Sequence, residues 1–391
     1  MNPLLQLEEH GQSYWLDDLT RAMLDSGALK RRVEKDGLRG VTSNPATFHR
    51  AITEGGDYDA EIDRLATEGQ SAESIYEAIV TRDVRDACDV LRPVFDRTEG
   101  VDGYVSLEVS PHLAHDAGAS IAEAKRMHAC VDRPNLLVKI PATRAGLLAI
   151  EELLVHGIGV NVTLLFSVER YEAVAAAYAK ALERRLDAGQ EIAGIASVAS
   201  FFLSRIDVLI DRLLKHRVGP RLVHAEEARS LLGTVGIANA KMAYSAFRRL
   251  MAEERWRALE SKGARRQRLL WASTSVKNPQ YRDVAYVEPL IGRDTVTTLP
   301  ESTIAALEDH GSVQSTLALH ADVAERIMRR LARLDIDFPA AAEELLNEGV
   351  QKFIEPYDAL LEILEERRRS RRKVLAVGGR AHEARTLAVF D

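Results

Sequence analysis

Short runs of β-branched and other apolar residues alternate with long amphipathic stretches along most of the chain. Such runs predict buried strands, and their alternation with helices is typical of a parallel α/β sheet or barrel. We predict eight strands, at residues 13–17, 38–43, 104–108, 136–140, 159–163, 195–198, 269–272 and 294–298. Apolar residues recur three and four positions apart within 323–334 and 346–364, which indicates amphipathic helices.

This order of elements favours an α/β fold of the (β/α)₈ TIM-barrel type with additional helices, built as one domain over residues 1–391. The chain exceeds the roughly 250 residues of a typical barrel. We assign the excess to helical insertions at 46–101 and 205–268 and to a helical C-terminal region at 300–375. Segment 374–391 is strand-like in composition and stays unassigned. A doubly wound open sheet is the alternative, but no GxGxxG turn follows an early strand to support it.

The composition and charge argue against a nucleic-acid-binding, membrane or exported protein. The sequence is 46% hydrophobic and 28% charged, which is ordinary for a globular protein. Its 52 Lys and Arg against 59 Asp and Glu give a net charge of −7, so the overall charge favours neither nucleic acid nor an acidic membrane as a partner. No apolar run reaches the roughly 18–20 residues that span a bilayer, and the acidic N-terminus lacks an export signal. We therefore expect a cytoplasmic protein.

Two further features of the sequence do not indicate an additional partner or metal. The basic run at residues 365–373 could suggest a nucleic-acid tail, but it follows an amphipathic helix. We interpret it as the solvated C-terminal end of that helix, where basic residues are favourable. The 2 cysteines cannot make a disulfide framework or a Cys-based zinc site, and the histidines lack paired metal spacing, so we expect no metal.

Polar side chains occur inside or directly after most of the predicted strands. Strands of a parallel barrel are buried on both faces and should read as apolar runs, and polar residues at their C-terminal ends point into the mouth where barrel active sites lie. These residues are Asp17, Thr42, Ser43, Asn44, Glu108, Lys139, Asn161, Thr163, Ser200, Ser273, Thr274 and Ser275. So many at equivalent ends predict a polar active site.

Lys139 is the most informative of them, because it lies inside the apolar run LLVKI. Burial disfavours the charged ammonium, and a neutral lysine amine can add to a ketone carbonyl. The alternative is a structural ion pair with Glu108 or Asp17. A Schiff base needs acid–base groups to lose water and to move protons during carbon–carbon cleavage. The two carboxylates end different strands, so they can serve two such roles in one cavity.

Six segments, in the same order along most of the chain, resemble those of the transaldolase family, in particular its longer bacterial type. They are SYWLDDLTRAMLDSG, DGLRGVTSNPATFHRAI, VDGYVSLEVSPHLAHD, RPNLLVKIPATRAGLLAIEEL, NVTLLFSVERYEAV and ASVASFFLSRID. The resemblance implies a barrel without metal or organic cofactor. It also implies transfer of a dihydroxyacetone unit between sugar phosphates in the non-oxidative pentose phosphate pathway.

The resemblance also implies roles for single residues. Lys139 in VKIPAT is similar to the Schiff-base lysine, Asp17 in WLD to the general base for the hydroxyl next to the broken bond, and Glu108 in SLEVS to an acid–base group that acts through a water. The residues that match substrate- and water-positioning groups are Thr42, Asn44, Asn161, Thr163 and Ser200.

Phosphate binding, by the same resemblance, falls on Arg205 in FLSRID and on Ser275 and Lys277 in ASTSVKNP. Shorter family members have arginine where Lys277 stands, and lysine binds phosphate as a point charge without the planar fork of a guanidinium. Val276 replaces a small polar residue of related chains. Phe202 falls where family members distinguish transfer from simple aldol cleavage, and phenylalanine is on the transferase side.

The resemblance implies sedoheptulose 7-phosphate or fructose 6-phosphate as donor and glyceraldehyde 3-phosphate or erythrose 4-phosphate as acceptor. One alternative is an aldolase that uses the same imine but releases free dihydroxyacetone. The other is a non-catalytic barrel that binds a sugar phosphate. Every catalytic position holds a chemically competent residue, which favours an enzyme. The sequence leaves the oligomeric state open between monomer and homodimer.

Overall fold

The computed structural model describes residues 2–217 and 224–387, with side chains up to residue 371, and contains a closed barrel of eight parallel strands in chain order. The strands are β1 (Gln12–Leu16), β2 (Gly40–Thr42), β3 (Tyr104–Glu108), β4 (Leu136–Pro141), β5 (Val160–Leu165), β6 (Ser197–Phe202), β7 (Arg268–Ala272) and β8 (Thr295–Leu299). Because β1 pairs with both β2 and β8, the sheet has no edge. The predicted TIM barrel is confirmed, and the open-sheet alternative is wrong.

All eight predicted strands exist, but several boundaries were wrong. The largest error is at β6, which continues to Phe202, whereas the prediction stopped at Val198. Ser200 therefore lies inside the strand and not after it. Alanine and serine interrupt the β-branched run, yet they fit a strand that is buried on both faces. Similarly, β5 extends to Leu165, beyond a register shift at which Leu164 has a φ of 60°.

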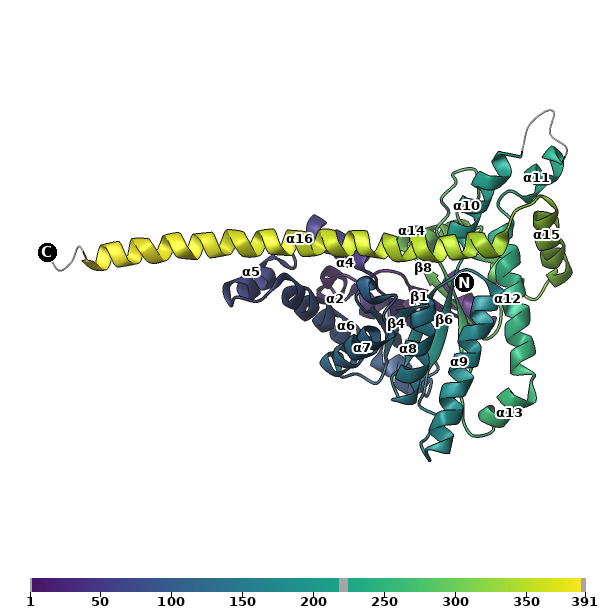
Figure 1. Ribbon diagram of the computed structural model, residues 1–391, viewed down its shortest axis with the longest axis horizontal. Helices are drawn as coiled ribbons and strands as arrows, with labels where there is room; N and C mark the ends of the chain where they lie inside the picture. The colour runs from purple at the N-terminus through teal and green to yellow at the C-terminus, as the bar shows by residue number, and fades with distance from the viewer. Residues whose placement is uncertain (1, 218–223, 388–391) are drawn as a thin grey trace.

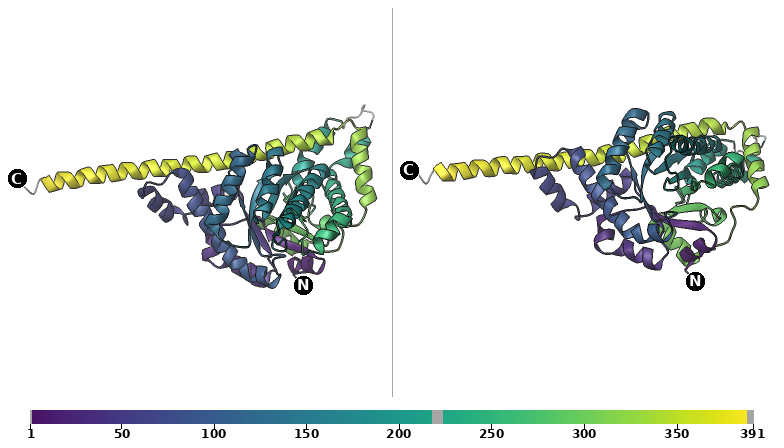
Figure 2. Two further views of the ribbon diagram at one scale, coloured as in Figure 1. Left: turned by 60° about the horizontal axis from the view of Figure 1, so that its bottom comes forward. Right: turned by 90° about the horizontal axis from the view of Figure 1, so that it is seen from below.

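Helices surround the barrel (Figures 1 and 2). They are α1 (Pro3–Glu9), α2 (Arg21–Asp25), α3 (Ala28–Lys35), α4 (Pro45–Glu54), α5 (Asp59–Thr67), α6 (Ala72–Arg97), η1 (Pro111–Leu113), α7 (Ala117–Val131), α8 (Arg144–Val155), α9 (Val168–Asp187), α10 (Ser204–Lys215), α11 (Ala225–Leu231), α12 (Val235–Met251), α13 (Glu254–Glu260), η2 (Glu288–Leu290), α14 (Glu301–His310), α15 (Ala321–Arg333) and α16 (Phe338–Leu387). None in the described part of the chain is long and apolar enough to cross a bilayer. The assignment of all residues to one domain stays a prediction.

The long helix α16 crosses one end of the barrel and continues past α5 (Figure 1). The basic run 365–373 was predicted as a helix end, which is wrong, because it lies inside α16. There Arg367 pairs with Asp59, and Arg371 pairs with Asp63, both on α5. The strand-like reading of segment 374–391 is also wrong for 374–387, which are helical, while 388–391 lie outside the described residues. Extending an existing helix costs less than nucleating new structure, and this outweighs local composition.

The interior of the barrel contains a packed apolar layer. Trp15, Leu137, Val198, Leu270 and Val296 come from five strands and are almost fully buried. Gly40 completes this layer because a Cβ there would lie 2.4 Å from the Trp15 ring. The layer closes the barrel from below and forms the floor under the side chains that follow on the same strand faces.

Candidate active site

The inward-facing side chains beyond the apolar layer form the candidate site. Successive side chains of a strand alternate between its two faces, so the residue two positions after an inward-facing one also points inward. Two positions after Trp15, Leu137 and Val198 come Asp17, Lys139 and Ser200. The period of the strands therefore places a ring of polar groups at the C-terminal mouth.

A cavity of about 180 Å³ opens at this mouth. Its lining includes the predicted residues Asp17, Thr42, Asn44, Lys139, Thr163, Ser200, Phe202, Arg205, Ser275 and Lys277. The other two predicted residues, Glu108 and Asn161, are buried behind the lining and are hydrogen-bonded to Lys139 and Ser200, respectively. The structure thus brings all of the predicted residues together.

Lys139 and Glu108 form a buried pair on adjacent strands, in direct register. Each residue is 5% exposed, and Lys139 Nζ donates to Glu108 Oε2 at 3.1 Å and to the backbone oxygen of Ser43 at 3.2 Å. Burial raises the pKa of Glu108 above its ordinary value, although the positive charge of Lys139 opposes this shift. A carboxylate with a raised pKa is a stronger base, and this one lies within hydrogen-bonding distance of the Lys139 ammonium, whose proton it can accept.

A separate chain of hydrogen bonds lies beside this pair, on the neighbouring strands. Ser200 Oγ donates to Asn161 Oδ1 at 2.6 Å, and Asn161 Nδ2 donates to Ser106 Oγ at 3.0 Å. Thr163 has no exposed surface, and its hydroxyl finds no hydrogen-bond partner within the described chain. A buried hydroxyl without a partner costs free energy, so it favours a water or substrate oxygen beside it.

Asp17 and Asn44 lie on the opposite side of the mouth from β5 and β6. Thr42 Oγ1 lies 2.9 Å from Asp17 Oδ1, to which it can donate, and 3.0 Å from Thr298 Oγ1. Asn44 caps α4, because its Oδ1 accepts from the backbone N–H of Thr47 at 3.1 Å. Its amide nitrogen is the group that remains available to a substrate.

Two cations meet at one end of the cavity. Arg205 lies in the first turn of α10, and Lys277 lies in the loop after β7, where its Nζ donates to Ser275 Oγ at 2.6 Å. Neither forms a salt bridge with a described carboxylate, and Arg205 Nη1 is buried without an acceptor there. Burial lowers the pKa of Arg205, and burial together with the charge of Arg205 lowers the pKa of Lys277. Two like charges held together favour an anion between them.

The loop that contains Ser275 and Lys277 is tied to α10 by two tyrosines. Tyr281 Oη donates to Asp211 Oδ2 at 2.5 Å, and Tyr286 Oη donates to Asp207 Oδ2 at 2.8 Å. Because Arg205 lies in the first turn of α10, these bonds hold the loop with Lys277 next to the helix that contains Arg205.

The sequence interpretation missed Phe353, which lines the same cavity from α16. Its ring centroid lies 5.6 Å from Lys139 Nζ and 5.8 Å from Arg205 Cζ. In the sequence Phe353 is one of several apolar residues on the buried face of an amphipathic helix. No signal in that pattern distinguishes it from the core residues beside it.

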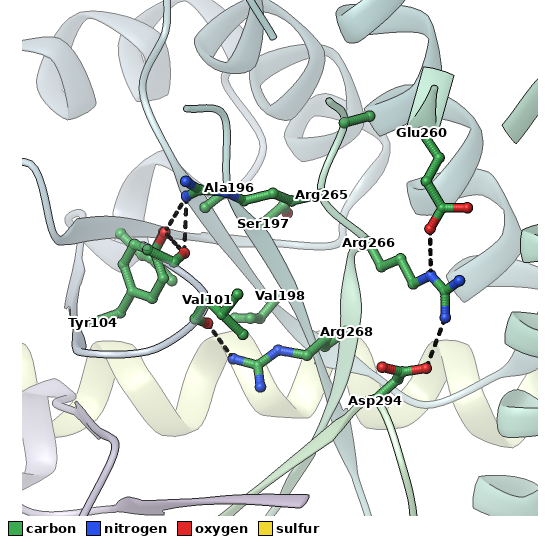
Figure 3. Close-up of a pocket in the computed structure, with 13 residues that line it drawn as sticks. Val101, Tyr104, Ala196, Ser197, Val198, Glu260, Arg265, Arg266, Arg268 and Asp294 are labelled. Atoms are coloured by element: carbon green, nitrogen blue, oxygen red, sulfur yellow. Dashed lines mark hydrogen bonds and ion pairs between the residues drawn. The ribbon is translucent and has the colours of Figure 1, made fainter. Parts of the chain in front are cut away.

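A second cavity, of about 200 Å³, lies at the opposite, N-terminal end of the barrel (Figure 3). Arg266 there pairs with Glu260 and Asp294, while Arg265 donates to Tyr104 Oη and to backbone oxygens (Figure 3). These arginines are engaged by the protein, and the hydroxyls of Ser197 and Tyr104 in the lining donate to backbone oxygens. The cavity at the mouth is therefore the candidate active site.

Comparisons with known proteins agree with this geometry. Residues 14–364 match the family model described as Transaldolase/Fructose-6-phosphate aldolase. The chain is 46% identical over 370 residues to a transaldolase of Trichodesmium erythraeum, and the match covers 94% of this chain and 97% of that protein. It is 47% identical over 372 residues to Transaldolase 2 of Nostoc punctiforme, with the same coverage of 94% and 97%. A transaldolase of Mycolicibacterium paratuberculosis is 46% identical over 364 residues, 92% of this chain and 96% of that protein.

Proposed function

The chain belongs to the transaldolase/fructose-6-phosphate aldolase family, its reaction is that of a transaldolase on sugar phosphates, and we propose that Lys139 carries the transferred dihydroxyacetone unit as a Schiff base. The observation that carries this assignment is the position of Lys139. Its amine lies 3.1 Å from a buried carboxylate, at a cavity that also contains two cations without carboxylate partners among the described residues. A nucleophile, a proton acceptor and an anion site in one cavity fit a ketose phosphate.

The first half of the reaction begins with proton transfer from Lys139 to Glu108. The neutral amine adds to the ketone carbon, and the resulting carbinolamine loses water with Glu108 as proton donor. A water held by Thr163 can relay this proton, because the unsatisfied hydroxyl of Thr163 lines the cavity and Asn161 lies in register with Lys139 on the next strand. The product is a protonated imine.

Cleavage then uses the carboxylate on the other side of the mouth. Asp17 takes the proton of the C4 hydroxyl, the C4 oxygen forms a carbonyl, and the electron pair of the C3–C4 bond moves into the protonated imine. The aldose phosphate leaves, and a three-carbon enamine stays on Lys139. An incoming aldose phosphate is attacked by the same carbon, Asp17 returns its proton, and hydrolysis of the new imine frees the product ketose.

The phosphate of each substrate binds Arg205, Ser275 and Lys277 in this proposal. The rigid spacing of these groups places the reacting carbons at a fixed distance from Lys139, so binding energy at the phosphate orients the bond that breaks. Phe202 lines the same cavity, with its ring centroid 5.3 Å from Arg205 Cζ. It offers no hydroxyl to hold a water there, which favours transfer over cleavage.

Borohydride reduction in the presence of fructose 6-phosphate tests the assignment of the lysine. Imine formation is expected to leave a reduced adduct on Lys139, located by peptide mass spectrometry. Lys241, the other buried lysine of the described chain, is the internal control, because its Nζ donates only to the backbone oxygens of Thr316 and Leu319. An adduct on Lys241, or none at all, would overturn the proposal. The same enzyme assayed with and without an acceptor aldehyde separates transfer from aldolase-type release.

The pH dependence of the wild-type enzyme should report Glu108. Because burial raises its pKa, Glu108 is protonated at a pH at which an ordinary glutamate is still ionised, and it then cannot accept the proton of Lys139. We expect kcat/KM to fall as the pH drops through this raised pKa. Glu108→Gln should lower kcat about 10²–10⁴-fold and remove this acidic limb. If kcat/KM of Glu108→Gln still fell at the same low pH, the fall would be caused by the titration of another group.

We further propose that the enzyme works in the cytoplasm, as a monomer or homodimer. Membership of the transaldolase family supports the cytoplasmic location, because the sugar phosphates on which it acts are charged, water-soluble metabolites. Light scattering at assay concentration distinguishes the two oligomeric states.

A further inference from the structure

The mechanism above gives no role to Phe353, an aromatic side chain that lines the cavity. Phe353 is 6% exposed, and its ring lies above both the nucleophile and the phosphate-binding arginine, with centroid distances of 5.6 Å to Lys139 Nζ and 5.8 Å to Arg205 Cζ. It is contributed by α16, while the other lining residues come from strands and from the segments that follow them.

The position of this ring is set by its neighbours one turn away on the same helix face. At Gly349 the helix approaches β5 so closely that a Cβ would lie 2.8 Å from Leu164 Cδ2. At the other side, Tyr357 packs edge-on against Tyr76 and His112, with ring centroids 5.2 Å and 5.8 Å apart. His112 Nε2 also lies 2.6 Å from Asp358 Oδ1. Contacts on both sides of Phe353 therefore hold α16 against the mouth.

The Phe353 ring is apolar, whereas the other groups that contact the Lys139 amine are polar. Glu108 and the backbone oxygen of Ser43 satisfy the amine by hydrogen bonds, whereas Phe353 presents an aromatic ring at 5.6 Å and offers no hydrogen bond. Together with Phe202, which also lies against Arg205, it forms an apolar part of the cavity wall that extends from the two cations to Lys139. Water is disfavoured beside such a wall.

Exclusion of water matters at one step. The enamine on Lys139 has two fates once the aldose phosphate has left. Its carbon attacks an aldehyde, or it takes a proton from water. In the second case, protonation of the carbon gives the iminium of dihydroxyacetone on Lys139. A further water then adds to this iminium, and free dihydroxyacetone and the amine of Lys139 are released.

We propose that Phe353 is a specificity-determining residue that keeps the enzyme a transferase, because its ring keeps water other than the one proposed at Thr163 away from the three-carbon enamine. This inference rests on the proposed Schiff base at Lys139. It assigns a function to the C-terminal helix, which closes the mouth over the intermediate.

The test compares dihydroxyacetone release from fructose 6-phosphate alone with transfer to erythrose 4-phosphate. Phe353→Ala opens the space beside Lys139 to water, and we expect the ratio of release to transfer to rise about 10-fold. Phe353→Leu refills part of the space and should raise it less. In D₂O the released dihydroxyacetone should contain one solvent deuterium, which shows that it arises by protonation of the enamine.

Ile354→Ala is the matched control. Ile354 is the next residue of α16 and packs on the core without lining the cavity, so its truncation loosens the helix but leaves the wall intact. It should lower Tm and leave the ratio unchanged. An unchanged ratio in both Phe353 variants, or an equal rise in Ile354→Ala, would overturn the inference. Failure of the Schiff base itself would appear separately, as a wild-type enzyme without a borohydride adduct on Lys139.

Discussion

Lys139→Met should lower kcat/KM for dihydroxyacetone transfer by at least about 10⁴-fold, while sugar phosphates still bind. Methionine preserves the length and apolar stem of the side chain but has no nucleophilic nitrogen. The phosphate contacts at Arg205, Ser275 and Lys277 are not altered, so the loss should appear in kcat. Conversion of fructose 6-phosphate and erythrose 4-phosphate measures the activity, and calorimetry with the same sugar phosphates measures binding.

The folding of this variant needs its own control, because Glu108 loses its partner. An unpaired carboxylate in a buried site is costly, and it responds by taking up a proton. We therefore expect Lys139→Met to stay folded, with Glu108 neutral. Lys241→Met is the control, because it removes the other buried ammonium of the described chain. The protein that folds should retain transfer activity. If Lys139→Met retained more than a trace of transfer, another group would be the nucleophile. If the wild-type enzyme bound sugar phosphates without turnover, the chain would be a binding protein.

Arg205→Gln is expected to lower kcat/KM for erythrose 4-phosphate about 10²-fold and to change kcat/KM for unphosphorylated erythrose much less. The guanidinium is half-buried and has no carboxylate partner in the described chain, so its charge is available to a phosphate. Glutamine keeps a hydrogen-bond donor but removes the charge. Steady-state assays with the two acceptors, at one donor concentration, measure the difference.

Arg212→Gln makes the same charge change on the same helix and serves as the control for Arg205→Gln. Arg212 is exposed, and its nearest carboxylate is Glu344 at 3.5 Å. This exposed arginine should tolerate the change with little effect on either acceptor. Equal losses for both acceptors in Arg205→Gln would indicate that Arg205 only supports the structure, and no loss would move the phosphate site elsewhere.

Much of the site follows from the sequence because strand geometry is local. A polar residue inside or directly after an apolar strand has one place to point in a parallel barrel, so Asp17, Glu108 and Lys139 could be placed in one mouth before any contact was known. Strand ends were less accurate, because the extent of β6 depends on burial of its alanine and serines against neighbours that are distant in the chain.

The barrel, the Schiff-base candidate and the residues at the strand ends could be predicted from the sequence, since these depend on periodicity and on motifs of adjacent residues. Three contacts are visible only in the folded chain. They are the pairing of Glu108 with Lys139, the position of Arg205 and Lys277 at one end of the cavity, and the place of Phe353 of α16 in the cavity lining. These contacts join residues far apart in the chain. The helical periodicity of α16 predicts an apolar face but does not predict which element packs against it. What that face covers depends on where packing against α4, α5 and α6 places the helix.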